Sequence, residues 1–492
     1  MNQIKAYNIF GRQVAYVIAS SLIVTVLGVI QTPILTKSLG SSSYGVWSLI
    51  STTVLLMFPF GMLSFNNSIV RFLAAEKDNN KIREDFYSAF LLVLISGAIF
   101  SLLLFLFSGF IATYVLKDLH QVQYIRLGSI LVSLYSLFPV LLAFFKREGN
   151  IGIYTVLDLS FNVISFGLMV FFVLSGFGLR GLLLAIIVSS LALNIIALVI
   201  IFNRVGFQRP HFYNMKSYLK WGIPLIPNSA IWWIIQASDR YIIAYFLGES
   251  AVGIYSIANT IGLYSSFALM PVATVLYPII SKKYDEGNYD ECRNYFQYSF
   301  KYLMMVTIPA AFGLSILAKP LLQILTTSEF ISGNYVVALC AFGALLNCFQ
   351  QLCSYILHLV GKTQIILRIL SIGAVLNVIF NIALVPRMGI LGAGVGSLIS
   401  YGVLGLLTLL VTRRYLKFDL NLLFILKSLI ASFIMGLGIW LLKPESLFTV
   451  VVSIIVGILL YFTILLIIRG FSKTELAFFL SFVRKSITIN KS

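Results

Sequence analysis

Charged residues are scarce in this 492-residue sequence: Asp, Glu, Lys and Arg together make up 11% of it. Soluble domains carry about 25% charged residues, and no water-soluble core could bury the 59% of residues that are hydrophobic here. A soluble protein is therefore excluded. The apolar runs reach about 20 residues or more, whereas the strands of a membrane barrel alternate and are about 10 residues long. The sequence predicts an all-α polytopic membrane protein.

The sequence also lacks the residue clusters that catalysis or metal binding would need. Of four cysteines, Cys292 lies in a polar loop and the other three share one apolar segment without metal-ligand spacing, which favours buried packing thiols. The GKT of residues 361–363 has isoleucine at position 356, where a phosphate-binding loop needs glycine. No paired carboxylates or Ser-His-Asp set lies outside the apolar runs. We therefore predict no enzymatic activity, no metal site and no cofactor.

Fourteen apolar segments are long enough to cross a membrane as helices. They cover residues 13–36, 44–65, 86–109, 122–145, 151–175, 180–202, 218–247, 251–279, 297–318, 330–358, 363–385, 389–412, 421–442 and 447–468. The first run is too long for a cleavable signal and lacks an A-x-A site, so we expect it to be retained as a helix. The intervening segments are short, so no extramembrane domain is expected.

The lysine and arginine residues follow the predicted topology. Most of the 35 lie on the side that holds both termini, and cytoplasmic loops carry such an excess. The opposite side holds only Lys37, Lys117, Arg126, Arg180, Lys319, Arg387 and Lys443. Both termini are therefore predicted to be cytoplasmic. Topology explains most of the net charge of +18, so no nucleic-acid partner is expected.

One short pattern occurs twice in the sequence. Residues 39–50 read LGSSSYGVWSLI, and residues 247–258 read LGESAVGIYSIA. The first copy lies between the first and second predicted spans, and the second copy lies between the seventh and eighth. Because an even number of spans separates them, both copies have the same orientation in the membrane. Parallel repeats of this kind are related by an axis along the membrane normal. We predict two six-helix lobes, 1–212 and 213–416, followed by two helices and a tail in 417–492. Two lobes with a cleft between them suit alternating access.

The predicted span 218–247 carries Asp239 and Arg240 within its apolar length. A charge at the bilayer centre costs roughly 2.5–3.5 kcal/mol on insertion scales, so such residues usually face a cavity or a partner. Neighbouring residues point about 100° apart on a helix, so the two cannot form one simple pair. Pro224 and Pro227 interrupt the same helix and predict a hinge. The alternative is that both charges only fix the packing against neighbouring helices.

Four further charged residues are candidates for a translocation path. Asp158 and Arg368 lie a few residues inside the cytoplasmic ends of equivalent spans, where both could line an inward-facing cavity. Snorkelling to the interface explains Arg368 equally well. Arg71 follows the second span and could meet a lipid phosphate or serve as an interface anchor. Lys37 ends the first span, where a plain outer-end charge is the simpler interpretation.

Several stretches resemble a known family. SDRYIIAYFLGESAVGIYSIANTI at residues 238–261 resembles the helix 7–8 signature of polysaccharide exporters, the Wzx-type O-antigen and repeat-unit flippases. LTKSLGSSSYGVWSL at 35–49 and NSIVRF at 67–72 resemble the helix 1–2 region of that family, a branch of the multidrug/oligosaccharidyl-lipid/polysaccharide superfamily. The resemblance covers most of the chain, and it includes the fourteen helices and the two-lobe repeat.

The resemblance implies a transport function. Family members move polyprenyl-pyrophosphate-linked oligosaccharide units from the cytoplasmic to the periplasmic leaflet, for surface polysaccharides such as the O-antigen of lipopolysaccharide. Asp239, Arg240 and Arg71 match the family's charged positions. The implied location is the bacterial cytoplasmic (inner) membrane. The implied partners are lipid-linked oligosaccharide and membrane lipids, with a polysaccharide polymerase and a chain-length regulator as further candidates, and coupling to a proton or sodium gradient is expected.

Two other functions stay open. A multidrug or cation antiporter of the same superfamily would have an acidic cleft and usually twelve helices, whereas the charges within these spans are mixed and lean basic. A membrane glycan polymerase usually has a large periplasmic loop, and the outer loops here are short.

Overall fold

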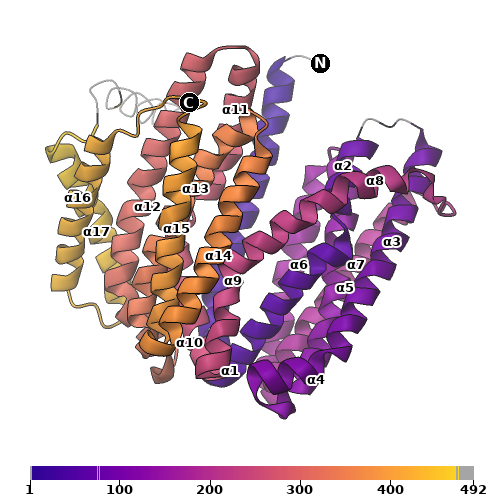
Figure 1. The fold of residues 1–492 in the computed structure, drawn as a ribbon, viewed down its shortest axis with the longest axis horizontal. Helices are drawn as coiled ribbons and strands as arrows, with labels where there is room; N and C mark the ends of the chain where they lie inside the picture. Colours follow the sequence, from indigo (N-terminus) through magenta and orange to yellow (C-terminus); the bar gives the residue numbers. More distant parts are fainter. Residues whose placement is uncertain (1–2, 75, 77, 472–474, 476–492) are drawn as a thin grey trace, which may run out of the picture. The chain divides into compact units, whose positions relative to one another are not determined.

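The computed structural model describes residues 3–74, 76, 78–471 and 475. Its α-helices are α1 (Gln3–Met62), α2 (Phe65–Leu73), α3 (Asn79–Leu106), α4 (Ser108–Ile111), α5 (Val122–Arg147), α6 (Ile151–Phe172), α7 (Gly178–Val205), α8 (Met215–Gly222), α9 (Ile226–Leu247), α10 (Glu249–Leu263), α11 (Leu269–Asp285), α12 (Tyr289–Leu325), α13 (Asn334–Leu359), α14 (Thr363–Met388), α15 (Ile390–Thr412), α16 (Leu422–Leu441) and α17 (Leu447–Ile467). Short 3-10 or π turns are η1 (Ala112–Leu116), η2 (Leu119–Gln121), η3 (Val173–Phe177), η4 (Phe212–Asn214), η5 (Ile223–Leu225), η6 (Tyr264–Ser266) and η7 (Ser328–Gly333). No strand occurs in these ranges, and the predicted all-α membrane fold is confirmed (Figure 1).

All fourteen predicted spans fall on helical segments. Ten helical runs of the described residues are long and apolar enough to cross a membrane, and α10 with α11, bent by 42°, makes an eleventh. Two of the ten runs, Ala19–Leu73 and Ile151–Val205, are 55 residues long and contain two predicted spans each. Non-helical glycines divide them at Gly40 and Gly176. The predicted span 218–247 is not among the apolar runs, and it is divided into α8, η5 and α9.

The duplicated turn has the same backbone conformation in both copies. Gly40 has φ 72° and ψ 176°, and the equivalent Gly248 has φ 86° and ψ 176°. Residues with a side chain rarely adopt this conformation, which explains why both copies of the turn contain glycine here. The two copies of the turn therefore share this backbone conformation, and the two-lobe repeat stays a prediction.

Short polar side chains begin several of the helices. The Asp78 carboxylate accepts a hydrogen bond from the backbone N–H of Asn80 at the start of α3. Asn150 accepts from the N–H of Ile153 at the start of α6. Such caps satisfy N–H groups that have no partner within the helix, which matters most where no water is at hand.

The chain divides into two compact units. Unit 1 comprises residues 1–257, 325–330 and 374–393, and unit 2 comprises 258–324, 331–373 and 394–492. These units group elements by contact, and the lobe boundaries at 212 and 416 stay a prediction.

Small residues bring helices together in unit 1. A Cβ on Gly97 of α3 would lie 3.2 Å from the Cα of Ser133 on α5. The Ser136 hydroxyl of α5 donates to the carbonyl of Phe58 on α1, at 3.2 Å. Close backbone approach at Gly and Ser, with hydroxyl hydrogen bonds across the interface, is typical of helix packing in membranes.

Unit 2 has its own core, which α11, α12 and α13 share. Phe296, Phe300 and Leu303 of α12 are buried in it. All four cysteines are free and buried, as expected for packing thiols. The expectation that Cys292 lies in a polar loop is wrong. Its thiol is in the first turn of α12, which begins earlier than predicted, at Tyr289, and turns this residue toward the core.

The helices α16 and α17 pack on each other and on α12 in unit 2. Their contact includes a hydrogen bond between the hydroxyls of Ser428 and Tyr461, 2.8 Å apart. Lys301 of α12 is also buried here, and its Nζ lies 2.7 Å from both carboxylate oxygens of Glu475. Lys301 lies inside the predicted span 297–318, and this ion pair balances its charge.

Candidate functional site

The proline pair lies where the predicted helix 218–247 breaks. Pro224 belongs to the 3-10 turn η5, and Pro227 lies in the first turn of α9. Proline has no N–H to donate and is tolerated at such a start. The predicted break is therefore confirmed, and the hinge motion stays a prediction.

The part of this helix before the break is held by α3. The Asp85 carboxylate, which is buried, accepts hydrogen bonds from Asn214 Nδ2 at 3.1 and 3.2 Å and from the Tyr218 hydroxyl at 3.2 Å. The helices α2 and α8 lie side by side (Figure 1). Sequence reasoning missed Asp85, because a carboxylate at the start of a span also fits an exposed helix end.

Asp239 lies on α9 and is enclosed, with 3% of its surface exposed. Its Oδ1 accepts a hydrogen bond from the backbone N–H of Arg240 at 2.8 Å. Its Oδ2 accepts a hydrogen bond from the Tyr255 hydroxyl of α10. The Arg240 Nη1 lies 4.0 Å from Oδ1, at the limit of an ion pair. The carboxylate is therefore fixed by partners on α9 and α10.

Arg240 connects α9 with α10 and, through it, with α1. Its side chain is 13% exposed. Its Nε donates to the Ser256 hydroxyl at 3.2 Å, and its Nη1 donates to the Gln236 carbonyl at 3.1 Å. The Ser256 Oγ lies 2.6 Å from the Ser48 Oγ of α1. Despite their separation of about 100° on the helix, the side chains of Asp239 and Arg240 reach the limit of an ion pair with each other, and each also has a partner on α10.

The two copies of the repeated turn, here called the turn pair (residues 39–50 and 247–258), pack against each other. A Cβ on Gly45 would overlap the backbone carbonyl of Glu249, and a Cβ on Gly253 would overlap that of Ser41. Ser41 and Glu249 hold the same position in the two copies. The contacts are therefore reciprocal about a local twofold axis. Only glycine permits so close an approach of two backbones.

Two carboxylates accept hydrogen bonds from the first copy of the repeated turn. Glu329 Oε2 accepts from the backbone N–H of Ser41 at 3.0 Å and from its hydroxyl at 2.6 Å. Glu249 accepts a hydrogen bond from the Ser42 hydroxyl, and the hydroxyls of Ser41 and Ser250 lie 2.7 Å apart. Glu329 also meets the positive end of a helix, which favours its negative charge. Sequence reasoning missed both carboxylates, although Glu249 lies inside the repeat that it identified.

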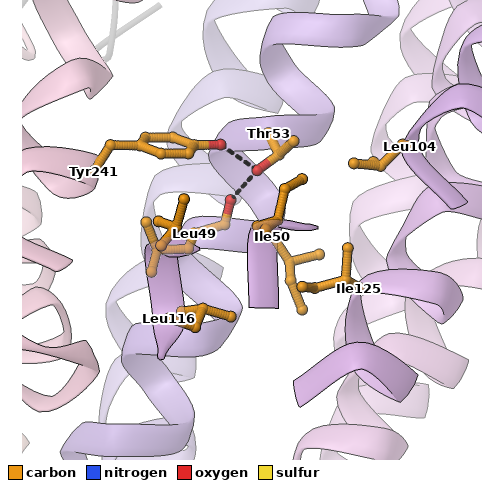
Figure 2. Close-up of a pocket in the computed structure, with 9 residues that line it drawn as sticks. Leu49, Ile50, Thr53, Leu104, Leu116, Ile125 and Tyr241 are labelled. Carbon is orange, nitrogen blue, oxygen red and sulfur yellow. Dashed lines mark hydrogen bonds between the residues drawn. The ribbon is translucent and has the colours of Figure 1, made fainter. Parts of the chain in front are cut away.

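At the end of the first repeated turn, the space between α1 and α9 is tightly packed. Figure 2 shows the Tyr241 hydroxyl of α9 directed at Thr53 of α1, among the apolar side chains of Leu49 and Ile50. The cavity there has a volume of about 10 Å³, room for about one water molecule. Trp233 Nε1 adds a hydrogen bond of 2.7 Å to the carbonyl of Thr52.

The other predicted site residues lie on separate elements. Arg71 is exposed at the end of α2, with its guanidinium 5.0 Å from the ring of Trp221. Lys37 is exposed on α1. Asp158 is half-buried on α6, within electrostatic reach of Lys146. Arg368 is exposed on α14, in unit 2. The structure thus brings Asp239 and Arg240 together with the turn pair, and their roles stay predictions.

The contact between the two repeated turns combines hydrogen bonds with buried apolar side chains. Hydroxyls, carboxylates and backbone carbonyls meet there, and the apolar side chains of Val46, Val252 and Ile257 are fully buried beside them. Water can replace each of these hydrogen bonds when the surfaces separate, so separation leaves no polar group without a partner. Opening would also expose the buried apolar side chains of the turn pair, at a cost of roughly 25 cal/mol per Å² of apolar surface.

The chain belongs to a family described as polysaccharide biosynthesis protein, whose match covers residues 34–333. The family resemblance stated from residues 238–261 is thereby confirmed.

Two curated relatives match part of the chain. It is 29% identical over 234 residues to an uncharacterized membrane protein MJ1068 of Methanocaldococcus jannaschii, covering 47% of this chain and 45% of that one. It is 24% identical over 278 residues to the probable low-salt glycan biosynthesis flippase Agl15 of Haloferax volcanii, covering 55% of this chain and 58% of that one. The chain thus spans about half the length of the curated relatives it matches.

The fold is similar to those of solved transporters. The inward closed conformation of the lipid II flippase MurJ matches with a TM-score of 0.76 at 17% identity, over 92% of this chain and 99% of that one. An inward-facing multidrug resistance MATE family transporter of the MOP superfamily matches with a TM-score of 0.65 at 16% identity, over 80% and 94%. At these identities the likeness concerns the fold alone, and it agrees with the superfamily that the sequence predicts.

Proposed function

We propose that this protein is a flippase that moves lipid-linked glycan units across a membrane for polysaccharide biosynthesis. The turn pair carries the proposal. It joins one copy of the motif from each predicted lobe, and its hydrogen bonds are ones that water can replace, as alternating access would require of a contact that opens. Family membership and the description of Agl15 as a probable glycan biosynthesis flippase support the glycan substrate.

The substrate we propose is an oligosaccharide on a polyprenyl pyrophosphate. Its hydroxyl and phosphate groups each cost several kcal/mol when they enter hydrocarbon without partners. A polar path removes that barrier, while the prenyl tail stays in the lipid. Arginine suits the pyrophosphate because its guanidinium forms paired, charge-assisted hydrogen bonds to phosphate oxygens. Arg71 is exposed in unit 1 and available for this contact.

Asp239 and Arg240 have different roles in this proposal. Asp239 is enclosed and fixed by Tyr255, so we assign it to positioning the arginine. Arg240 reaches Ser256, which contacts Ser48 across the turn pair. Opening the turn pair would separate these two serines and expose more of the guanidinium to the head group. Asp158, Arg368 and Lys37 are further proposed contacts along the path.

The proposed setting follows the sequence. Both termini would be cytoplasmic, the membrane would be a bacterial inner membrane, and the product would feed a surface polysaccharide such as O-antigen. A polymerase and a chain-length regulator are the proposed partners, and a proton or sodium gradient the proposed driving force. A multidrug antiporter is the second candidate, because a MATE transporter shares the fold.

A gene deletion tests the proposal. We expect lipid-linked glycan units to accumulate on the cytoplasmic leaflet, with loss of surface glycan, and a plasmid copy to restore both. Complementation with Arg240→Ala should fail, whereas Arg180→Ala, at another arginine predicted to lie near the outer side, should succeed. Normal surface glycan in the deletion strain, together with raised sensitivity to cationic drugs, would instead identify an antiporter.

A further inference from the structure

A groove opens at the end of α3 and the start of α5, within unit 1. It has a volume of about 570 Å³, and its lining includes Phe105, Leu119, His120, Gln123, Arg126 and Ile130. The neighbouring Lys117 donates a hydrogen bond of 2.8 Å to the carbonyl of Tyr245, which directly precedes the second repeated turn. The groove is therefore at the same end of unit 1 as the turn pair, which the charge distribution predicts to be the outer end.

Arg126 is held in a fixed position in this groove. Its guanidinium carbon lies 4.9 Å from the centre of the Phe105 ring, and its Nε donates to the Ser108 hydroxyl at 3.3 Å. A guanidinium is planar, so these two contacts together restrict its orientation.

No carboxylate balances the charge of Arg126 among the residues that the structure describes. The nearest acidic residue along the chain, Asp118, accepts hydrogen bonds from the backbone N–H of His120 at 2.9 Å and from Gln121 Nε2 at 2.8 Å. The groove therefore presents one oriented cation and no matching anion.

The surroundings of Arg126 are apolar and face outward. Phe105, Leu119 and Ile130 are 41%, 66% and 43% exposed. Exposed aromatic residues continue along this edge at Phe110 and Tyr114, as is common where a protein meets the membrane interface. A ligand that fits has an anionic head for the arginine and a hydrocarbon chain for the apolar lining.

We propose that this groove binds an anionic phospholipid of the outer leaflet, with its phosphate on Arg126 and an acyl chain against Phe105, Leu119 and Ile130. Paired N–H bonds from a guanidinium to phosphate oxygens favour arginine over lysine here. This site is independent of the proposed transport function, since none of its residues belongs to the predicted path.

Native mass spectrometry of the full-length protein with added phosphatidylglycerol tests this site. We expect the wild type to retain phosphatidylglycerol more strongly than phosphatidylcholine. Arg126→Gln should weaken one binding site about tenfold, as expected for one lost charge-assisted contact. Arg126→Lys should retain phosphatidylglycerol more weakly than the wild type and more strongly than Arg126→Gln. Arg180→Gln, at another arginine of the predicted outer side, should retain it as the wild type does.

A second variant removes the site without touching Arg126. Leu119→Glu places a carboxylate in the groove at an exposed position, so we expect it to neutralise the arginine and lower phosphatidylglycerol retention at unchanged thermal stability. Equal retention by the wild type and both variants would overturn the proposal. Preference of the wild type for added geranylgeranyl pyrophosphate over phosphatidylglycerol would also overturn it.

Discussion

The glycines at the centre of the turn pair allow a sharp test of closure. A methyl group at Gly45 would overlap the carbonyl of Glu249, and one at Gly253 would overlap that of Ser41. Gly167 on α6 is also helical, but a Cβ there meets nothing within 4 Å. We expect Gly45→Ala and Gly253→Ala to open the turn pair, and Gly167→Ala to leave it closed.

The size of the effect follows from packing. Alanine is about 1 kcal/mol more favourable than glycine inside a helix, and that gain applies to all three variants. Overpacking typically costs about 1–3 kcal/mol. If the closed state bears this cost and the open state does not, the open population rises about 5- to 150-fold. The local twofold axis predicts similar effects at the two glycines.

Cysteine labelling measures the opening. Ser256→Cys introduces a thiol at the contact, and the four native cysteines are buried, which keeps the background low. We expect a membrane-impermeant maleimide to label this thiol at least five times faster in the Gly45→Ala background than in the Gly167→Ala background. Equal labelling rates in the two backgrounds would refute the reasoning.

Three further predictions concern buried charges and the proline break. Asp239→Ala should lower thermal stability by about 1–3 kcal/mol, because it removes a hydrogen bond to a charged group at a buried position; equal melting temperatures in detergent would contradict this. Arg240→Ala should stop glycan export at normal expression. Pro224→Ala with Pro227→Ala should slow transport in proteoliposomes without loss of stability, and undiminished transport would contradict a hinge. Lys301→Ala should cost about 3–5 kcal/mol, since it removes the positive charge that balances a buried carboxylate, and restoration of the melting temperature by removing that carboxylate as well would confirm the pair.

Much of the fold could be predicted because the membrane imposes simple rules. Apolar length placed the predicted spans on helical segments, and the duplicated turn predicted an internal repeat. Gly40 and Gly248 then adopt nearly the same unusual backbone conformation. The prolines also located the break in the predicted helix 218–247, although α8 begins before that range.

The candidate site was harder to predict, because its partners are distant in sequence. Asp239 and Arg240 were chosen as candidates because a charge is rare in an apolar run, and their role in a site stays a prediction. Glu329 binds Ser41 from 288 positions away, and nothing in its own neighbourhood signals this contact. Lys301 lies inside the predicted span 297–318, but its partner Glu475 is 174 positions away, so the sequence around it does not signal the buried ion pair.

The most direct test of the central claim is a cross-link across the turn pair. Ser48 and Ser256 occupy the same position in the two copies, and their Oγ atoms lie 2.6 Å apart. We predict that the double variant Ser48→Cys, Ser256→Cys, joined by a short thiol cross-linker, stops movement of a labelled lipid-linked glycan in proteoliposomes, and that a reductant restores it. Undiminished movement with the cross-link in place would contradict the claim that this contact must open during transport.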